Sequence, residues 1–445
     1  MADYRMADKM TSSTPPPAAG NRQFGLIRSF GHRNYRLFFM GQGISLIGTW
    51  MQNLALGWLV YKITGSELLL GVVGFSSQIL TFAAAPFAGV LADRVNKRAL
   101  LVVTQSTALV QALILAVLTL MKHADGTPLI RVWQIIALSA LLGLVNGFDM
   151  PTRQSFVVEM LEDRADLPNA IALNSFMFNG AQLIGPAVAG IVVKLVGEGI
   201  CFLLNAVSFL AVIAALLAMR VQPKSAEAAG RRVLRSFKEG AQYVAGHKPI
   251  LSLLLLLATL SLVGMPYRVL MPVFAKDILH GDSFTYGCLT SAIAVGAIIA
   301  ALFLASRKSV RGLGQILTAA VALFGAAMLC FSRSTHLWLS LGLLVFTGFA
   351  TMTLMASCNT LIQTLVDDDK RGRVMSFYTI SFVGLGPFGS LLVGALAARL
   401  GAPTAVFING LGCLAAAAVF WIWLPRFLRL VHPTFVRMGI AAEAE

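Results

Sequence analysis

Long apolar stretches that almost lack charge recur along the whole chain, between residues 37 and 424. Of the 445 residues, 57% are hydrophobic and 12% are charged, which is too little charge to cover the surface of a water-soluble domain. The hydrocarbon core of a lipid bilayer requires about 20 apolar residues for each helical crossing. The sequence therefore predicts an all-α membrane protein that crosses a bilayer many times.

The apolar stretches fall into two sets of six. The expected crossings are 37–60, 68–92, 99–121, 130–150, 170–194 and 199–219, then 250–273, 284–305, 313–332, 336–358, 375–398 and 402–424. Five regions follow from them: a cytoplasmic arm over 1–33 with its first ~20 residues disordered, a six-helix bundle over 34–219, a cytoplasmic linker over 220–248, a second bundle over 249–424 and a cytoplasmic tail over 425–445. The second part of the linker has the pattern of a helix that lies on the membrane surface.

The basic residues are distributed unevenly over the loops. With a cytoplasmic N-terminus, 27 of the 35 Lys and Arg residues lie on the inner side and seven on the outer side, while Arg268 falls within a crossing. Loops rich in Lys and Arg stay in the cytoplasm. Both termini are therefore predicted to be cytoplasmic. The net charge of +15 is topological, and no nucleic-acid partner is expected.

The two halves of the chain also repeat a pattern. Gly185-Pro186 and Gly386-Pro387 are 201 positions apart, and Asn205 and Asn409, which follow them, are 204 positions apart. Pseudo-symmetric halves with a binding site at their interface are a common plan of secondary transporters. Coincidence among helices rich in small residues is the alternative explanation.

Other classes of function leave no trace in the sequence. The six histidines and five cysteines are scattered, with no metal-ligand spacing and no catalytic cluster, and there is no phosphate-binding Gly-rich loop. No enzyme activity, cofactor or metal is therefore expected, and the protein is expected to be a monomer. A membrane receptor or scaffold is the alternative from another class. Such a protein is expected to carry a soluble domain of about 50 residues or more, and no stretch of this sequence provides one.

The most specific motif lies between the second and third crossings. It reads Gly89-Val-Leu-Ala-Asp93-Arg94-Val-Asn96-Lys97-Arg98. It resembles the loop signature of the major facilitator superfamily, in which glycine usually stands where this chain has Asn96, a residue that tolerates the left-handed conformation. The resemblance implies twelve helices in two bundles and a cytoplasmic gate formed by Gly89, Asp93, Arg94, Lys97 and Arg98. A loop that only sets topology is the alternative.

Two further patterns bear on direction and branch. Gly185-Pro186-Ala-Val-Ala-Gly190 resembles the Gly-Pro motif that marks exporters of this superfamily more often than importers, and an ordinary kinked helix is the alternative. Segments such as Gly48-Thr49-Trp50-Met51-Gln52 and 146–154 resemble the bacterial branch that contains the enterobactin exporter. The resemblance implies a bacterial inner-membrane protein that exports a siderophore-like or drug-like molecule. Facilitated or proton-coupled uptake of a small solute is the alternative.

In this superfamily the first, fourth, seventh and tenth helices line the central cavity, and polar residues follow that scheme here. On the first crossing they recur at helical spacing and so share one face, which is costly against lipid. The predicted cavity residues are Gln42, Ser45, Thr49, Gln52, Asn53, Asn146, Asn179, Gln182, Tyr267, Arg268 and Thr351. For any single amide, a hydrogen bond between helices is the competing explanation.

Three charged residues remain. Arg268 lies inside a crossing and is expected either to attract an anionic or catechol-like group, or to reach toward the membrane interface. Asp149 and Arg153 lie one helical turn apart and are expected to form an ion pair at a gate, with a proton site as the alternative. Protons therefore stay an open possibility as coupling ions.

Overall fold

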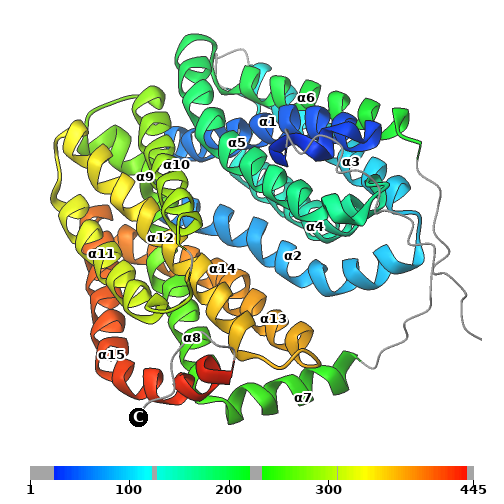
Figure 1. Ribbon diagram of the computed structural model, residues 1–445. Coiled ribbons are helices and arrows are strands. Elements are labelled where there is room, and N and C mark those ends of the chain that lie inside the picture. Colours follow the sequence, from blue (N-terminus) through cyan, green and yellow to red (C-terminus); the bar gives the residue numbers. More distant parts are fainter. Residues whose placement is uncertain (1–24, 123–127, 221–232, 308, 438–445) are drawn as a thin grey trace, which may run out of the picture.

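The computed structural model describes residues 25–122, 128–220, 233–307 and 309–437, and within them the chain is almost entirely helical (Figure 1). Eleven of the helices are long and apolar enough to cross a membrane. α1, from Arg33 to Thr64, makes a twelfth long helix, and its amide pair Gln52 and Asn53 lowers its mean hydropathy. The predicted all-α, multi-pass fold is confirmed.

The helices keep the order that the hydropathy predicts. The first six are α1, α2 (Glu67–Arg94), α3 (Lys97–Leu120), α4 (Val132–Val157), α5 (Leu167–Val196) and α6 (Glu198–Ala218). The later ones are α8 (Lys248–Thr259), α9 (Met271–Val273), α10 (Ser283–Ala305), α11 (Leu313–Arg333), α12 (Leu337–Leu365), α13 (Arg371–Thr379), α14 (Gly386–Leu400) and α15 (Ala402–Arg437). Between the two sets lies the amphipathic helix α7 (Val233–Gly246), while residues 1–24, where disorder is expected, are outside the described part.

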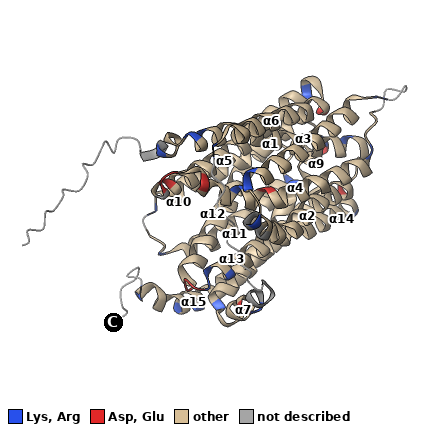
Figure 2. Ribbon diagram, turned by 90° about the vertical axis from the view of Figure 1, so that its right-hand side faces the viewer, with Lys and Arg blue, Asp and Glu red and all other residues tan. Residues whose placement is uncertain are grey.

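The helices pack mainly within two halves, residues 33–218 and 248–437. In the first half α1 packs against α5 and α6, and α2 against α4; in the second, α11 packs against α12 and α15. The most extensive packing between the halves is that of α2 with α14 and of α5 with α10. Most charged residues lie near the ends of helices, and long stretches without charge separate them, as a membrane-embedded protein requires (Figure 2).

Two crossings are broken helices. The crossing that begins with α8 continues through the π-helical turn η4 (Leu260–Gly264), the 3-10 segment η5 (Met265–Leu270), α9 and a second π-helical turn, η6 (Phe274–Ile278). A third π-helical turn, η7 (Ile380–Gly384), separates α13 from α14. The Ser261 hydroxyl donates to the Phe382 carbonyl at 2.6 Å, so the two breaks are joined. Such turns are rare and occur frequently at functional sites.

The two ends of the molecule differ. We call the end formed by 64–67, 196–198 and 278–283 the sealed end, and the end formed by 94–97, 157–167 and 365–371 the motif end. Among the described residues, the polar and ring contacts that join the halves come from 58–78 and 183–194 on one side and from 276–291 and 388–390 on the other. These contacts lie toward the sealed end.

Candidate functional site

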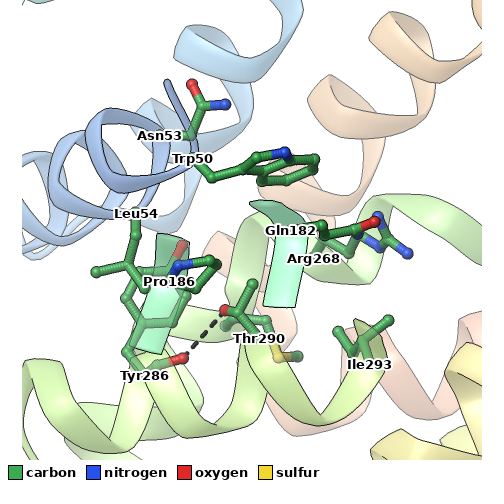
Figure 3. Close-up of a pocket in the computed structure, with 10 residues that line it drawn as sticks. Trp50, Asn53, Leu54, Gln182, Pro186, Arg268, Tyr286, Thr290 and Ile293 are labelled. Atoms are coloured by element: carbon green, nitrogen blue, oxygen red, sulfur yellow. Dashed lines mark hydrogen bonds between the residues drawn. The ribbon is translucent and has the colours of Figure 1, made fainter. Parts of the chain in front are cut away.

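A cavity of about 120 Å³ lies between the two halves (Figure 3). Four crossings line it: α1 with Trp50, Asn53 and Leu54, α5 with Gln182 and Pro186, the broken helix with Arg268 and Met271, and α10 with Tyr286, Thr290 and Ile293. In Figure 3 Trp50, Gln182 and Arg268 lie on one side of the cavity, and Tyr286, Thr290 and Ile293 lie on the other. The wall is mostly apolar, with a few polar groups, as in ligand sites generally.

The broken helix accounts for the position of Arg268. Pro266 and Pro272 lack the N–H groups that a regular helix uses, and they flank Arg268 within η5 and α9. Tyr267 and Arg268 are neighbours within η5, and their side chains lie close enough to interact. Tyr267 is 1% exposed and packs edge-on against Phe324 of α11, while Arg268 lines the cavity.

Of the predicted cavity residues, Asn53, Gln182 and Arg268 line this cavity. Gln52, next to Asn53, points into the first half. Its amide donates to Gln111 at 3.1 Å and accepts from Asn205 at 2.8 Å, joining α1 to α3 and α6. At Gln52 the structure therefore has the hydrogen bonding between helices that was the competing explanation.

Replacing Gln52 with Leu is expected to lower stability without changing ligand binding. Both hydrogen bonds are lost, and at about 0.6–1.7 kcal/mol for each bond in a membrane protein the loss is roughly 1–3 kcal/mol. Asn53→Leu is the matched control, because it removes an amide from the cavity instead. Thermal unfolding in detergent checks the prediction, and equal unfolding temperatures for Gln52→Leu and wild type would contradict it.

The other predicted cavity residues lie outside the lining of this cavity. Gln42, Ser45 and Thr351 are buried, the Thr49 hydroxyl donates to the Ser45 carbonyl at 2.9 Å, the Asn179 amide donates to the Ser175 carbonyl at 2.8 Å, and Asn146 is half-buried. The Thr351 hydroxyl is buried without a hydrogen-bond partner in the described structure.

Asp149 and Arg153 are brought together on α4. Arg153 Nη2 lies 3.5 Å from Asp149 Oδ2, and Asp149 is 3% exposed. Asp149 Oδ1 also accepts hydrogen bonds from Thr104 Oγ1 at 3.0 Å and Gln105 Nε2 at 2.7 Å. The carboxylate therefore links α4 to α3 as well as pairing with the arginine.

The loop motif closes α2 and opens α3. The surroundings of Gly89 and of the Asp93 side chain lie outside the described part of the structure, and Arg94 is exposed. Lys97 Nζ lies 2.6 Å from Glu159 Oε1, and Arg98 Nη2 donates to the Leu217 carbonyl at 2.6 Å. Both contacts stay within the first half.

Asn96, which stands where the superfamily usually has glycine, has a different role from the one that its tolerance of the left-handed conformation suggested. Its φ is −64°, so the left-handed conformation is not used. Its side chain instead accepts a hydrogen bond from the Ala99 amide at 3.2 Å and caps the N-terminus of α3. Asn is among the preferred residues at that position because it satisfies an otherwise unpaired amide.

The Gly-Pro segment of α5 is closely approached by two neighbouring helices, α1 and α10. A Cβ on Gly185 would lie 2.5 Å from Trp50 Cβ of α1, and one on Gly190 would lie 2.8 Å from the Ser283 carbonyl oxygen of α10. A Cβ on Gly287 of α10 would in turn lie 2.6 Å from the Pro186 carbonyl oxygen. Small residues on both helices thus allow the halves to touch backbone to backbone.

Polar pairs complete the sealed end. Lys194 Nζ lies 2.9 Å from Asp282 Oδ2, and the Tyr61 hydroxyl donates to Asp277, both across the halves. Partial burial acts to raise the pKa of Asp282, but the hydrogen bond from Lys194 and the Thr285 and Phe284 amides outweigh it, and the pKa lies below its usual value. Asp282 therefore stays ionised near neutral pH and keeps its partner.

Sequence reasoning missed these sealed-end pairs and six of the lining residues: Trp50, Leu54, Met271, Tyr286, Thr290 and Ile293. Most of them are apolar or aromatic and look like ordinary membrane-helix residues. Tyr286 and Thr290 are one turn apart on α10, and this helical spacing of two polar residues is the signal in the sequence that could have identified them.

Comparisons with known proteins agree on one family. The family model described as transmembrane secretion effector matches residues 27–429. The staphyloferrin A transporter of Staphylococcus aureus is 27% identical over 403 residues, covering 89% of this chain and 97% of that protein. The multidrug efflux pump Tap of Mycolicibacterium fortuitum is 25% identical, covering 88% and 93%.

Solved structures share the fold. A peptide transporter POT in complex with sulfate superposes with a TM-score of 0.71 at 12% identity, covering 89% of this chain and 95% of that chain. A bacterial homologue of the human lysosomal transporter Spinster, inward-facing and unoccupied, gives 0.66 at 14% identity, covering 96% and 100%. The chain is therefore a multi-pass membrane transporter, and it belongs to the transmembrane secretion effector family of the major facilitator superfamily.

Proposed function

We propose that the protein exports a small molecule by alternating access, with the cavity between the halves as its binding site. One observation carries the proposal: polar contacts join the halves around a cavity toward the sealed end, while none of the described polar contacts at the motif end joins one half to the other. Opening the sealed end and closing the motif end would expose the same cavity to the other side of the membrane.

The orientation follows from the basic residues. Because Lys and Arg are concentrated in the loops of the motif end, that end faces the cytoplasm, and both termini lie there. The arrangement described here is then open to the cytoplasm and ready to load substrate. Residues 34–219 and 249–424 move as two bundles, joined by the linker over 220–248, in the cytoplasmic membrane of a bacterium.

The substrate class comes from the relatives. Their names specify staphyloferrin A and multidrug efflux, and another relative is the macrolide efflux protein A of Streptococcus pyogenes, 23% identical. A siderophore-like or drug-like molecule fits this range. Coupling to protons is part of the proposal, with Asp149 as a buried carboxylate on the side of α4 toward the motif end, although its pairing with Arg153 favours a gate role. The protein acts as a monomer.

Flux through liposomes tests the proposal. Purified protein should transport a siderophore or dye when a proton gradient is imposed across the liposome membrane. Asp93→Asn should reduce the transport rate about tenfold, since the coupling free energy between two sites is typically about 1–3 kcal/mol. The matched control is Glu162→Gln, an exposed carboxylate of the α4–α5 loop, which should transport normally. Flux equal to that of empty liposomes for all candidates would rule out the export function.

A further inference from the structure

Arg268 brings the only formal charge to the cavity lining. Its guanidinium carries a full positive charge. Among the described residues no carboxylate is paired with it. Of the acids in or beside the sealed end, Asp277 accepts from Tyr61, Asp282 pairs with Lys194 and Glu198 pairs with Lys62. A cation without a carboxylate partner among the described residues is thus held inside a membrane protein, where a charge is costly and generally functional.

An anion in the cavity would relieve this cost. Carboxylate matches the planar fork of a guanidinium and forms two parallel hydrogen bonds with it. The same charge repels a cationic molecule, and a neutral one leaves the guanidinium without a counter-charge. The cavity is therefore electrostatically selective, independently of its shape.

The other walls define the rest of the ligand. Gln182 and Asn53 add amide groups beside Arg268, and the Trp50 indole supplies a flat apolar surface (Figure 3). A volume of about 120 Å³ is well below the roughly 300–1,000 Å³ of a site that encloses a drug-sized molecule. In this arrangement the cavity accommodates a head group and not a whole large substrate.

We infer that the protein selects organic anions, and that Arg268 binds a carboxylate of the substrate while Trp50 packs against the adjacent apolar or aromatic part. The inference rests on the proposed transport function and names its substrate class. Arg268 is then a binding residue, unlike the arginines at helix ends. Arg333, for example, lies with its guanidinium carbon 5.0 Å from the centre of the Phe407 ring.

Calorimetric titration of the full-length protein in lipid nanodiscs tests this directly. The probes are three compounds of matched shape: naphthalene carboxylate, the neutral carboxamide and the cationic naphthyl methylammonium. The carboxylate should bind the wild type about tenfold or more tightly than the carboxamide, which corresponds to one charge-assisted pair. The cation should bind least. Equal affinities, or no binding of any probe, would overturn the inference.

Variants assign the effect to Arg268. Arg268→Gln should abolish the preference for the carboxylate, and Arg268→Lys should retain part of it, because the charge stays but the fork is lost. Trp50→Phe should weaken the binding of all three probes, and Arg333→Gln should change none. A preference that survives in a folded Arg268→Gln protein would refute the assignment.

The inference and the proposed function can fail separately. If the wild type exports in liposomes but binds the carboxamide as tightly as the carboxylate, export stands and anion selection is wrong. If the preference for the carboxylate depends on Arg268 but the protein exports no siderophore or dye, anion selection stands and the export proposal is wrong.

Discussion

Gly348→Leu is expected to prevent the second half from folding. A Cβ at Gly348 of α12 would lie 1.9 Å from the Ile293 carbonyl oxygen of α10, and one at Gly296 of α10 would lie 1.9 Å from the Val345 carbonyl oxygen. The two backbones are in direct contact, so no side-chain rotation can make room. Overpacking typically costs about 1–3 kcal/mol, and a clash with backbone exceeds that.

The same helix supplies the control. Gly342 of α12 has no heavy atom within 4 Å of its Cβ position, so Gly342→Leu should yield a normal amount of monodisperse protein. Size-exclusion chromatography in detergent compares the two variants after equal expression. A Gly348→Leu protein that elutes as wild type, with an unchanged unfolding temperature, would show that α10 and α12 do not cross as closely as described.

Gly190→Leu is expected to leave the fold intact and keep the sealed end apart. The added Cβ would meet the Ser283 carbonyl oxygen at 2.8 Å and the Phe284 Cα at 3.0 Å, across the contact between α5 and α10. Under the proposed alternating access this contact forms and breaks between the halves, so the protein is expected to avoid the clash by populating the opposite state. Transport should fall about tenfold or more, the effect of a shift of about 1.4 kcal/mol or more.

Spin labels can report the change. Leu195 and Phe284 are exposed near the sealed end, on α5 and α10, and cysteines there in a background without the five native cysteines give an inter-half distance. The distance should lengthen in Gly190→Leu. Gly180→Leu, on the same helix with nothing within 4 Å of the Cβ position, should leave both distance and transport unchanged. An unchanged distance in Gly190→Leu would remove the basis for this role of the glycine.

The amides of α1 show why the candidate site was only partly predictable. Gln52 and Asn53 are neighbours, and both are polar residues in an apolar helix. Helical geometry rotates consecutive side chains by about 100°. Gln52 therefore meets Gln111 and Asn205 inside the first half, while Asn53 faces the cavity. Spacing along one helix indicates a shared face but not which neighbour that face meets.

The class of fold can be predicted from the amino-acid sequence, because twelve apolar stretches with basic loops have few stable arrangements other than helices across a bilayer. The glycines of α5 can be recognised in the sequence as well. Which residues meet depends on the packing of the two halves, since Tyr61 and Asp277 are 216 positions apart in the chain and form a pair across the halves. The position of Arg268 likewise depends on π-helical and 3-10 turns, whose local rotation no hydropathy pattern records.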